Sequence, residues 1–500
     1  MINSDLKYLA FDLGASSGRA IVGILNKNKD LSLIMLHRFP NKGFQIKNSI
    51  YWDLLYLFSE IKKSLLLFVK KFGPKLESIG IDCWGVDYVL LNKNDELAGP
   101  VHTYRDHRTD YILDKMLVTI PKEYIFKQTG IQILPINTST QLFSMVLNQS
   151  PELKIAKKLL MIPDYFNFLL SGIKVTEYSA ATTTQLYNPL KNEWSFELIN
   201  KINIQPELFC QIVKPGTILG NVQDYIVNEV GLNKDTKIIA PLCHDTGSAV
   251  AAVPVDMNKY KEGEWAYLSS GTWSLIGIEV KEPIINDKAL KFNFTNEGGI
   301  DNTIRFLKNI TGLWIIQECK KIWNIEKPNL DWEDILNKTN SSKPFKFFIN
   351  PDDSIFLNPD NMLDAIETFC LNHNQNPPKT IGEISRTILE SIAFRYKQTI
   401  SQMEYLTDKK IKILYIIGGG SKNVVLNQFT ANALNIPVKT GPSEATAIGN
   451  ILVQALSFGK IKDIYEIRKI VEKSFQIKEY HPKDVNKWDN GFINYLESVK

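Results

Sequence analysis

The sequence predicts an α/β protein built from two domains of related architecture. Two strand-turn-strand segments, Tyr8 to Leu25 and Ala266 to Ile278, each open one half of the chain, and both turns carry glycine and hydroxyl residues. The chain has 500 residues, of which 44% are hydrophobic, and chains of this size usually divide into two or three domains. A polar stretch, Asp256 to Glu264, separates the halves. We therefore expect domains at 1–254 and 255–500, with an extension after about residue 457.

Charge and composition exclude several classes of protein. The 58 basic and 54 acidic residues give a net charge of +4 without a concentrated basic field, so nucleic acid is not an expected partner. No apolar run approaches the ~18 residues that cross a bilayer, and Met1 to Lys7 lacks the apolar core of a signal peptide. The five cysteines show no CxxC spacing, which argues against a disulfide framework and a zinc site. We expect a cytoplasmic protein that does not bind membranes.

The first hairpin joins a strand, Tyr8 to Leu13, to a returning strand, Arg19 to Leu25, through the turn Gly14-Ala-Ser-Ser-Gly18. It is not a P-loop, because no Lys-Ser/Thr pair and no helix follow the last glycine. Its backbone N–H groups and two serines could meet phosphate oxygens. Asp12, at the end of the strand, could hold Mg²⁺ through water. An ordinary tight hairpin with a solvated Asp12 is the alternative.

The remainder of the first half supplies a third strand, a helix and two clusters of candidate ligand-binding residues. Leu31 to Phe39 reads as the strand and Trp52 to Phe72 as an amphipathic helix. The strand Ser78 to Asp82 leads into Trp84-Gly85, where backbone could approach a ligand beneath an aromatic wall, or where a core tryptophan stands beside a turn glycine. Tyr104 to Arg108 could fix sugar hydroxyls or form a surface ion-pair cluster.

The centre of the chain carries the candidate reacting group. An apolar strand, Lys237 to Leu242, is followed by Cys243-His-Asp-Thr-Gly-Ser248 and a short helix, Ala249 to Val253. Asp245 is thus placed at a strand-to-helix turn, where open α/β sheets meet their ligands. Its carboxylate is either the N-cap of the helix or a reacting group.

The second half repeats the opening pattern and adds a glycine loop. Strands at Ala266 to Ser270 and Trp273 to Ile278 flank the turn Gly271-Thr272. Farther along, the strand Ile411 to Ile417 enters the loop Gly418-Gly-Gly-Ser421. These glycines permit the close approach of a flat ligand such as adenine, or form merely a permissive turn. Helices are predicted at Asn423 to Leu434 and from Glu444 to about Leu456.

Eight stretches of this sequence, taken in their order along the chain, resemble the FGGY family of carbohydrate kinases. They are Asp12-Leu-Gly-Ala-Ser-Ser-Gly-Arg19, Trp84-Gly-Val-Asp-Tyr-Val-Leu-Leu91, Tyr104 to Thr109, His244-Asp-Thr246, Ser269-Ser-Gly-Thr-Trp-Ser-Leu275, Asn296-Glu-Gly-Gly299, Phe306 to Gln317 and Gly418-Gly-Gly420. The resemblance implies two actin-like, ribonuclease-H-like domains around a central cleft. It also implies ATP and Mg²⁺ as cofactors and a sugar as the second small-molecule substrate, in a monomer or homodimer.

The resemblance also assigns roles to single residues. Asp245 is implied to be the proton acceptor. The implied sugar contacts are Gly85, His244, Asp245, Thr246 and Asn309. The implied nucleotide contacts are Ala15, Ser16, Ser17, Gly18, Arg19, Thr272, Gln317 and Gly419. No metal ligands are implied.

The chemistry of phosphoryl transfer is consistent with these roles. An alcohol is a poor nucleophile at neutral pH, so a carboxylate within hydrogen-bond reach is the part that the reaction needs. The resemblance implies a kinase acting on the 1-hydroxyl of L-rhamnulose. The alternatives are a sibling kinase for L-fuculose, xylulose or another sugar, and a non-catalytic actin-like sensor of sugar or nucleotide.

Overall fold

The structure is a computed structural model that describes residues 5–500, and it contains two compact units. Unit 1 comprises the described residues up to Pro254 together with Glu279–Phe306 and Ala445–Ser474. Unit 2 comprises Val255–Ile278, Leu307–Glu444 and Phe475–Lys500. Both units are discontinuous in sequence, whereas the domains expected from the sequence are continuous. The first segment of unit 1 ends at Pro254, where the sequence places its domain boundary.

Unit 1 is centred on a six-stranded mixed sheet with the strand order β14-β15-β6-β1-β2-β3. Its strands are β1 (Leu6–Leu13), β2 (Ser17–Leu25), β3 (Leu31–Pro40), β6 (Ser78–Cys83), β14 (Thr217–Asn221) and β15 (Lys237–Ala240). β1 and β2 form the predicted antiparallel hairpin, while β6 runs parallel to both β1 and β15. The three parallel strands therefore present their carboxyl ends at one edge of the sheet.

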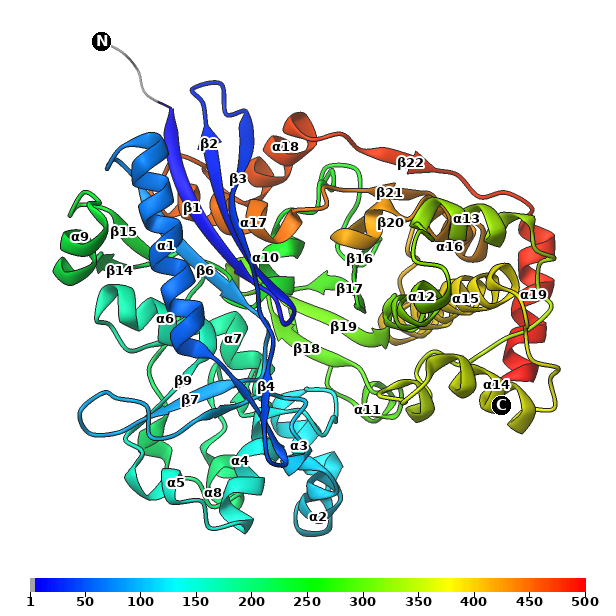
Figure 1. The fold of residues 1–500 in the computed structure, drawn as a ribbon, viewed down its shortest axis with the longest axis horizontal. Helices are drawn as coiled ribbons and strands as arrows, with labels where there is room; N and C mark the ends of the chain where they lie inside the picture. Colours follow the sequence, from blue (N-terminus) through cyan, green and yellow to red (C-terminus); the bar gives the residue numbers. More distant parts are fainter. Residues whose placement is uncertain (1–4) are drawn as a thin grey trace. The chain divides into compact units, whose positions relative to one another are not determined.

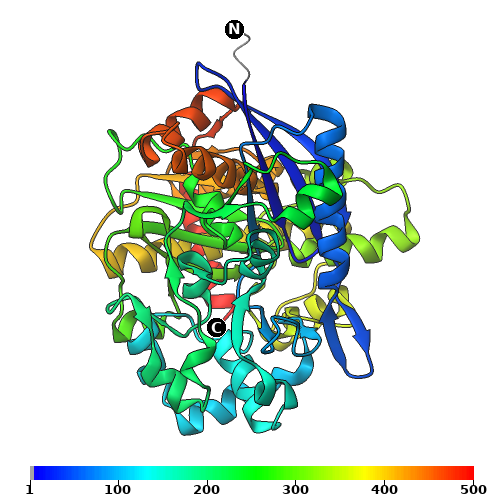
Figure 2. The ribbon, with the colours of Figure 1, turned by 90° about the vertical axis from the view of Figure 1, so that its left-hand side faces the viewer.

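Helices cover both faces of this sheet. α1 (Leu54–Phe72) and α6 (Ile162–Ser171) lie on one face, where the Phe58 and Phe166 rings stack with centroids 6.4 Å apart. Figures 1 and 2 both show α1 running alongside the blue strands. α17 (Ala445–Ser457) packs on β1 and β6, and on α10 (Asp245–Ala251). In this way a helix from late in the chain completes the core of unit 1.

The start of α1 differs from the sequence prediction, because Trp52 belongs to a strand. Asp53 is the N-cap, and its side chain accepts a hydrogen bond from the Tyr56 N–H. Trp52 instead ends β5 (Ser49–Trp52) and pairs with Val101. An Asp cap satisfies a helix N–H that would otherwise lack a partner, and it fixes the first turn one residue later.

Short elements form the rest of unit 1. The strands are β4 (Phe44–Ile46), β7 (Tyr88–Leu91), β8 (Val101–His102), β9 (Lys158–Met161), β10 (Thr176–Glu177), β11 (Tyr187–Asn188), β12 (Glu193–Trp194), β13 (Ile212–Val213) and β18 (Thr295–Gly298). The helices are α2 (Ile112–Thr119), α3 (Lys122–Thr129), α4 (Thr138–Leu147), α5 (Pro151–Ile155), α7 (Tyr178–Thr183), α8 (Phe196–Lys201), α9 (Asp224–Val230), α11 (Asp287–Lys291) and α18 (Ile464–Ser474).

The strands of unit 2 follow the order β19-β17-β16-β20-β21-β22. They are β16 (Trp265–Ser270), β17 (Trp273–Val280), β19 (Ile304–Thr311), β20 (Ile413–Ile417), β21 (Val438–Thr440) and β22 (Lys478–Tyr480). The last two residues of β17 (Glu279 and Val280) and the first three of β19 (Ile304 to Phe306) belong to unit 1. The helices of unit 2 are α12 (Trp314–Glu326), α13 (Trp332–Ser341), α14 (Met362–Asn372), α15 (Ile381–Thr407), α16 (Val424–Leu434) and α19 (Val485–Ser498), with the short 3-10 helix η5 (Gly419–Lys422) after β20.

The second predicted hairpin is present in unit 2, since β16 and β17 pair antiparallel. β20 pairs parallel to β16, as β6 does to β1 in unit 1. Along the chain, the segment after residue 457 supplies α18 to unit 1, and β22 and α19 to unit 2. No helix in residues 5–500 combines the length and the apolar character that crossing a bilayer requires.

Candidate active site

The carboxyl ends of the parallel strands bring the predicted residues of unit 1 together. Asp12 at the end of β1 is in register with Asp82 at the end of β6. Cys83 forms an isolated parallel bridge with His244, and the Cys83 N–H donates to the carbonyl of Cys243 at 2.9 Å. The segment Cys243 to Asp245 therefore continues the line of β15 and ends beside the other two strands. This edge is where open α/β sheets bind ligands.

Asp245 is the first residue of α10, and His244 occupies the N-cap position. The interpretation of Asp245 as the N-cap is therefore wrong. Its Oδ1 accepts hydrogen bonds from the Thr246 N–H at 2.5 Å and the Thr246 hydroxyl at 3.1 Å, and His244 Nε2 lies 3.3 Å away. The side chain is 31% exposed, so a substrate can reach it. A carboxylate at this position is also stabilised by the positive end of the helix dipole.

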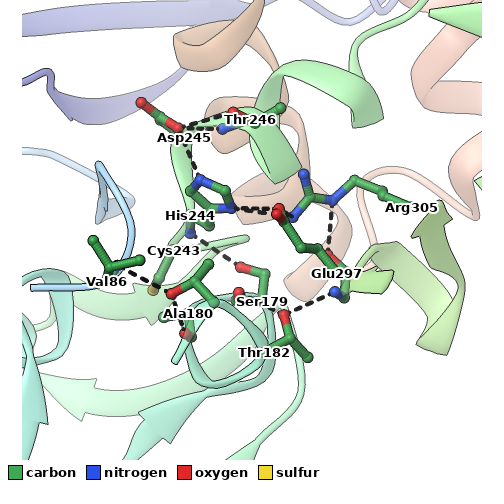
Figure 3. A network of polar contacts seen from close by, with 12 residues as sticks. Val86, Ser179, Ala180, Thr182, Cys243, His244, Asp245, Thr246, Glu297 and Arg305 are labelled. Carbon is green, nitrogen blue, oxygen red and sulfur yellow. Dashed lines mark hydrogen bonds and ion pairs between the residues drawn. The ribbon is translucent and has the colours of Figure 1, made fainter. Parts of the chain in front are cut away.

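His244 sits against a buried ion pair, shown in Figure 3. Its Nδ1 lies 3.1 Å from Arg305 Nη2 and 3.3 Å from Glu297 Oε2. Arg305 is fully buried; it lies 3.2 Å from the Glu297 carboxylate, and its Nε donates to the Gly298 carbonyl at 2.9 Å. Burial alone raises the pKa of Glu297, but the close contact with His244 and the charge of Arg305 outweigh burial and hold that pKa below its usual range. Glu297 is thus an anion in the interior of unit 1.

The backbone before Asp245 is fixed by the start of α7. Glu177 is buried, and its Oε2 accepts the Cys243 N–H at 2.9 Å and the Ser179 hydroxyl at 2.5 Å. The Ser179 hydroxyl in turn accepts the His244 N–H at 3.0 Å. Burial raises the pKa of Glu177 to about 7. One carboxylate therefore ties the N-terminus of α7 to the segment that carries the candidate base.

A second group of charges lies where β1 and β6 end. The Asp12 carboxylate pairs with Arg19 at 2.5 Å across the first hairpin. Asp82 is fully buried and accepts a hydrogen bond from Asn450 Nδ2 at 2.5 Å, while its Oδ1 has no hydrogen-bond partner within residues 5–500. Burial, followed by the nearby charge of Asp12, raises the pKa of Asp82 well above its usual range. Two carboxyl groups thus lie close together at this edge, and a bound cation would favour the ionised form of Asp82.

The turn of the predicted phosphate hairpin is accessible to solvent except at Gly18. Ser16 is exposed and Ala15, Ser17 and Arg19 are partly exposed, so backbone and hydroxyl groups are accessible in the turn. Gly18 is buried against Phe39, and a Cβ at Gly18 would lie 2.2 Å from that ring. This glycine is required by packing, while its neighbours remain available to a ligand.

Gly85 lies next to the segment that carries the candidate base, but its neighbour Trp84 is a core residue. Gly85 is partly exposed, two residues beyond the bridge that joins Cys83 to His244. The Trp84 ring is 7% exposed and donates from Nε1 to the buried Asp87 at 2.9 Å. The core-tryptophan interpretation therefore holds for Trp84, and no aromatic wall is needed to explain it.

In the predicted Tyr104 to Arg108 cluster, Asp106 and Arg108 make structural contacts. Asp106 is buried and accepts from the Ile50 and Arg108 backbone N–H groups. The Arg108 guanidinium donates to Gln141 at 2.6 Å. These contacts hold Asp106 and Arg108 in the connection after β8, while Arg105 and His107 are exposed and Tyr104 is partly exposed.

Four predicted residues belong to unit 2. In the second hairpin the Thr272 hydroxyl donates to Gln317 Oε1 at 3.3 Å, so these two nucleotide candidates do lie together. Gly419 is exposed at the start of η5, and a Cβ built there meets no atom within 4 Å. Asn309 is partly exposed on β19. Each of the four is accessible from the surface of its own unit.

Sequence reasoning gave no role to Glu297, Arg305, Glu177 or Asp82. Glu297 fell within a stretch that carried the family resemblance, and Asp82 was taken only as a strand end. The pairing of His244 with Glu297 and Arg305 spans 53 and 61 residues of sequence, and no local pattern reports such a contact. A charged residue amid apolar neighbours, such as Arg305 between Ile304 and Phe306, was the one available signal.

Known proteins match both halves of the chain. The model of the FGGY family of carbohydrate kinases, N-terminal domain, matches residues 7–252, and the C-terminal domain model of the same family matches residues 266–458. A rhamnulokinase of Bacteroides thetaiotaomicron is 40% identical over 494 residues, which are 99% of this chain and 99% of the relative. A rhamnulokinase of Oceanobacillus iheyensis is 42% identical over 473 residues, 94% of this chain and 97% of the relative.

The fold agrees with these sequence matches. The crystal structure of gluconate kinase from Lactobacillus acidophilus superposes with a TM-score of 0.81 at 18% identity, over 99% of this chain and 97% of that protein. The family and the two-domain α/β fold expected from the sequence are thereby confirmed. The chain therefore belongs to the FGGY family of carbohydrate kinases and is an ATP-dependent sugar kinase.

Proposed function

We propose that this kinase transfers the γ-phosphoryl group of ATP to the 1-hydroxyl of L-rhamnulose, giving L-rhamnulose 1-phosphate and ADP. The proposal of the sugar is supported by relatives named rhamnulokinase, which are about 40% identical over nearly the whole chain. The proposal of the reacting group rests on Asp245. A role in L-rhamnose breakdown follows from the product.

The observation that carries the mechanism is the unequal use of the two Asp245 oxygens. Two donors from Thr246 and the ring of His244 all converge on Oδ1. Within residues 5–500, Oδ2 is therefore the oxygen left to accept a proton. As the 1-hydroxyl attacks the γ-phosphorus, Oδ2 takes the hydroxyl proton and the P–O bond to ADP breaks. Asp245 is the general base in this scheme.

The remaining site residues bind and orient the substrates. In unit 1, Gly85, His244 and Thr246 contact the sugar, and the turn Ala15 to Arg19 contacts the phosphates through backbone N–H groups. In unit 2, Asn309 contacts the sugar, while Thr272, Gln317 and Gly419 contact the nucleotide. The observations that support these roles are the accessibility of the hairpin turn and of Gly419, and the contact between Thr272 and Gln317.

A magnesium ion fits the acidic edge of unit 1. Asp82 Oδ1 is buried without a hydrogen-bond partner in the described chain, and the pKa of Asp82 is raised by burial and then by Asp12. Asp12 and Asp82 would hold the ion through water, as suits a metal that retains its hydration shell. Within residues 5–500 no group of three or more His, Cys, Asp or Glu side chains is arranged to ligate a metal directly. The bound ion would offset the charge of the ATP phosphates.

An ADP-release assay over a panel of ketoses tests the proposal. L-rhamnulose, L-fuculose and xylulose are compared by kcat/KM with the same enzyme preparation, and phosphorus NMR identifies the product. A preference for L-rhamnulose with 1-phosphate as product is expected. A preference for another ketose would point to a sibling kinase. If none of the sugars is phosphorylated, the protein would instead be a non-catalytic sensor.

A further inference from the structure

Glu297 and Arg305 are charged groups buried behind the sugar-facing side of His244. Arg305 is 0% exposed and Glu297 is 6% exposed. Burying an Arg–Glu pair is costly, and replacing such a pair with apolar residues is often neutral or stabilising. A pair kept at this position therefore needs an explanation other than stability.

The geometry around the His244 ring restricts where its protons lie. A guanidinium can only donate, so the 3.1 Å contact between Arg305 Nη2 and His244 Nδ1 is a hydrogen bond when Nδ1 carries no proton. The ring proton of neutral His244 is then on Nε2, which lies 3.3 Å from Asp245 Oδ1. In Figure 3 the ring indeed lies between the two acidic side chains, with Arg305 on the Glu297 side. The carboxylate of Glu297 balances the arginine charge at 3.2 Å.

The backbone supports of the pair are also the supports of His244. Arg305 donates from Nε to the Gly298 carbonyl, and the Gly298 N–H donates to the Thr182 hydroxyl at 2.8 Å. Ser179, three residues earlier in α7, accepts the His244 N–H. One short helix thus anchors both the pair and the ring that it contacts.

We propose that Glu297 and Arg305 are positioning residues of this kinase, which together hold His244 with Nδ1 as an acceptor and direct its Nε2–H to Oδ1 of Asp245. The second oxygen of Asp245 is thereby kept free to act as the base. The inference rests on the proposed function, because it assigns the pair an effect on the base of that reaction. It gives a catalytic consequence to two charges that reach His244 from distant parts of the sequence.

The charges that face this system come from several elements. His244 faces Asp245 on α10, Glu297 on β18 and Arg305 on β19. Asp245 also acts electrostatically on Asp82 and Cys83 of β6 and on Tyr104, and Asp82 is further affected by Asp12 and Arg19. Removing one member of the Glu297–Arg305 pair leaves all of these groups in place. The change in net charge beside His244 is therefore the variable that the experiment alters.

The inference is tested by measuring kcat/KM as a function of pH for two single variants. We expect the acidic side of the pH profile, its acid limb, to shift in opposite directions in the two. Glu297→Gln keeps the size of the side chain but leaves the arginine charge unbalanced, which favours the ionised base. The acid limb should move to lower pH by roughly one unit. Arg305→Met leaves an unbalanced carboxylate, which disfavours the ionised base, so the limb should move to higher pH by a similar amount. In both variants kcat should fall, because the ring is no longer held by a balanced pair.

The double variant Glu297→Gln/Arg305→Met and a second ion pair serve as controls. The double variant restores local neutrality, so its limb should return toward the wild-type position while kcat stays low. Glu279→Gln alters another buried Arg–Glu pair of unit 1, whose carboxylate binds Arg468 at 2.8 Å and the Thr303 hydroxyl at 3.2 Å. This control should lower the melting temperature without moving the limb. Melting temperatures are measured for every variant, and Glu297→Gln alone decides the question if Arg305→Met does not fold.

The outcomes separate failure of the inference from failure of the proposed function. A wild-type enzyme that phosphorylates L-rhamnulose, together with folded variants whose limbs stay in place, would show that the pair is only structural. Shifts in the same direction for both single variants would also overturn the inference, since they would not follow the sign of the charge. Failure of the wild-type enzyme to phosphorylate any ketose would instead reject the proposed function.

Discussion

At the scale of single residues, the site separates the two oxygens of one carboxylate. Oδ1 of Asp245 is occupied by donors from its own helix and from His244, which orient the group. Oδ2 is directed away from these donors, as Figure 3 shows. A carboxylate that is oriented through one oxygen loses little freedom when it reacts through the other. Because one oxygen is held and the other is available, Asp245 is suitable as a base although it is also the first residue of a helix.

Replacing Asp245 with Asn tests this residue directly. The change keeps the size and one acceptor oxygen, so α10 should still begin at the same residue and the melting temperature should change little. Because the amide cannot take a proton, kcat should fall by about 10²- to 10⁴-fold. Sugar and ATP affinities, measured by calorimetry, should remain close to those of the wild type. A folded variant with near-normal kcat would contradict the assignment of the base.

Gly419 allows a test of the nucleotide site that does not disturb the fold. A Cβ at Gly419 meets no atom within 4 Å, whereas a Cβ at Gly420 would lie 2.0 Å from the Ser270 hydroxyl oxygen. Gly419→Val should therefore fold normally and raise the KM for ATP roughly tenfold, the effect of about 1.4 kcal/mol of steric conflict with a bound nucleotide. The KM for the sugar should change little. An unchanged KM for ATP would remove Gly419 from the nucleotide site.

At the scale of elements, the sequence predicts the two hairpins and the helices α1, α16 and α17, but neither the long helix α15 nor the middle of unit 1. β1, β2, β16, β17 and β20 were predicted because apolar runs bounded by glycine turns report buried strands. Between residues 109 and 201 the helices have only five to ten residues. In α4 the buried positions include Thr138, Ser139, Thr140 and Gln141, so polar side chains hide the apolar periodicity there. The burial of these groups depends on tertiary hydrogen bonds that the sequence does not display.

In the candidate site, too, the residues in local motifs were predicted and the residues that reach them from other elements were not. Asp245 was predicted because it stands at a strand end in a short polar motif, and the hairpin residues because their turn is rich in glycine and serine. The groups that orient Asp245 were missed because they reach it from other elements. Glu177 acts from the start of α7, Glu297 from β18 and Arg305 from β19. Their role exists only once the chain has folded.

The link between α7 and the segment before Asp245 is testable at Ser179. Its hydroxyl donates to Glu177 and accepts the His244 N–H, so Ser179→Ala leaves a buried N–H without its partner. The free energy of unfolding should fall by about 1 to 3 kcal/mol, and kcat should fall because the base is less firmly placed. Ser171→Ala is the control, since that hydroxyl makes only local contacts: it donates to the Asn167 carbonyl and accepts the N–H of the exposed Ile173. Chemical denaturation and steady-state kinetics on both variants measure the difference, and equal kcat values for the two would contradict the link.

At the scale of the whole molecule, the two units repeat one plan. In unit 1 the order β6-β1-β2-β3 places an antiparallel hairpin beside a parallel strand, and in unit 2 the order β20-β16-β17-β19 does the same. The ligand-binding candidates follow this repeat, since a turn with glycine and hydroxyl residues joins the two hairpin strands in each unit. The duplicated architecture inferred from two short hairpins therefore extends to the strand order of each unit.

Each unit also contains a buried glutamate whose ionisation opposes folding. Burial raises the pKa of Glu177 in unit 1 to about 7, and burial likewise raises the pKa of Glu390 in unit 2 to about 7, from an ordinary value of 4.5. Between these values the folded protein keeps protons that the unfolded chain has released. Stability from these two groups is therefore complete below about pH 4.5, declines as the pH rises to about 7, and changes little above that.

Glu177→Gln and Glu390→Gln should each flatten this part of the pH dependence. A neutral side chain of similar size removes the titration, so relative to wild type each variant should gain about 1.4 kcal/mol for every pH unit between about 4.5 and 7. Denaturant unfolding at half-unit steps from pH 4.5 to 8.5 measures the two curves. Glu383→Gln is the matched control, because Lys346 and backbone N–H groups lower the pKa of Glu383 to about 2, below the window. Its curve should therefore run parallel to wild type from pH 4.5 upward, and parallel curves for Glu177→Gln and Glu390→Gln as well would show that neither glutamate retains its proton in the folded protein.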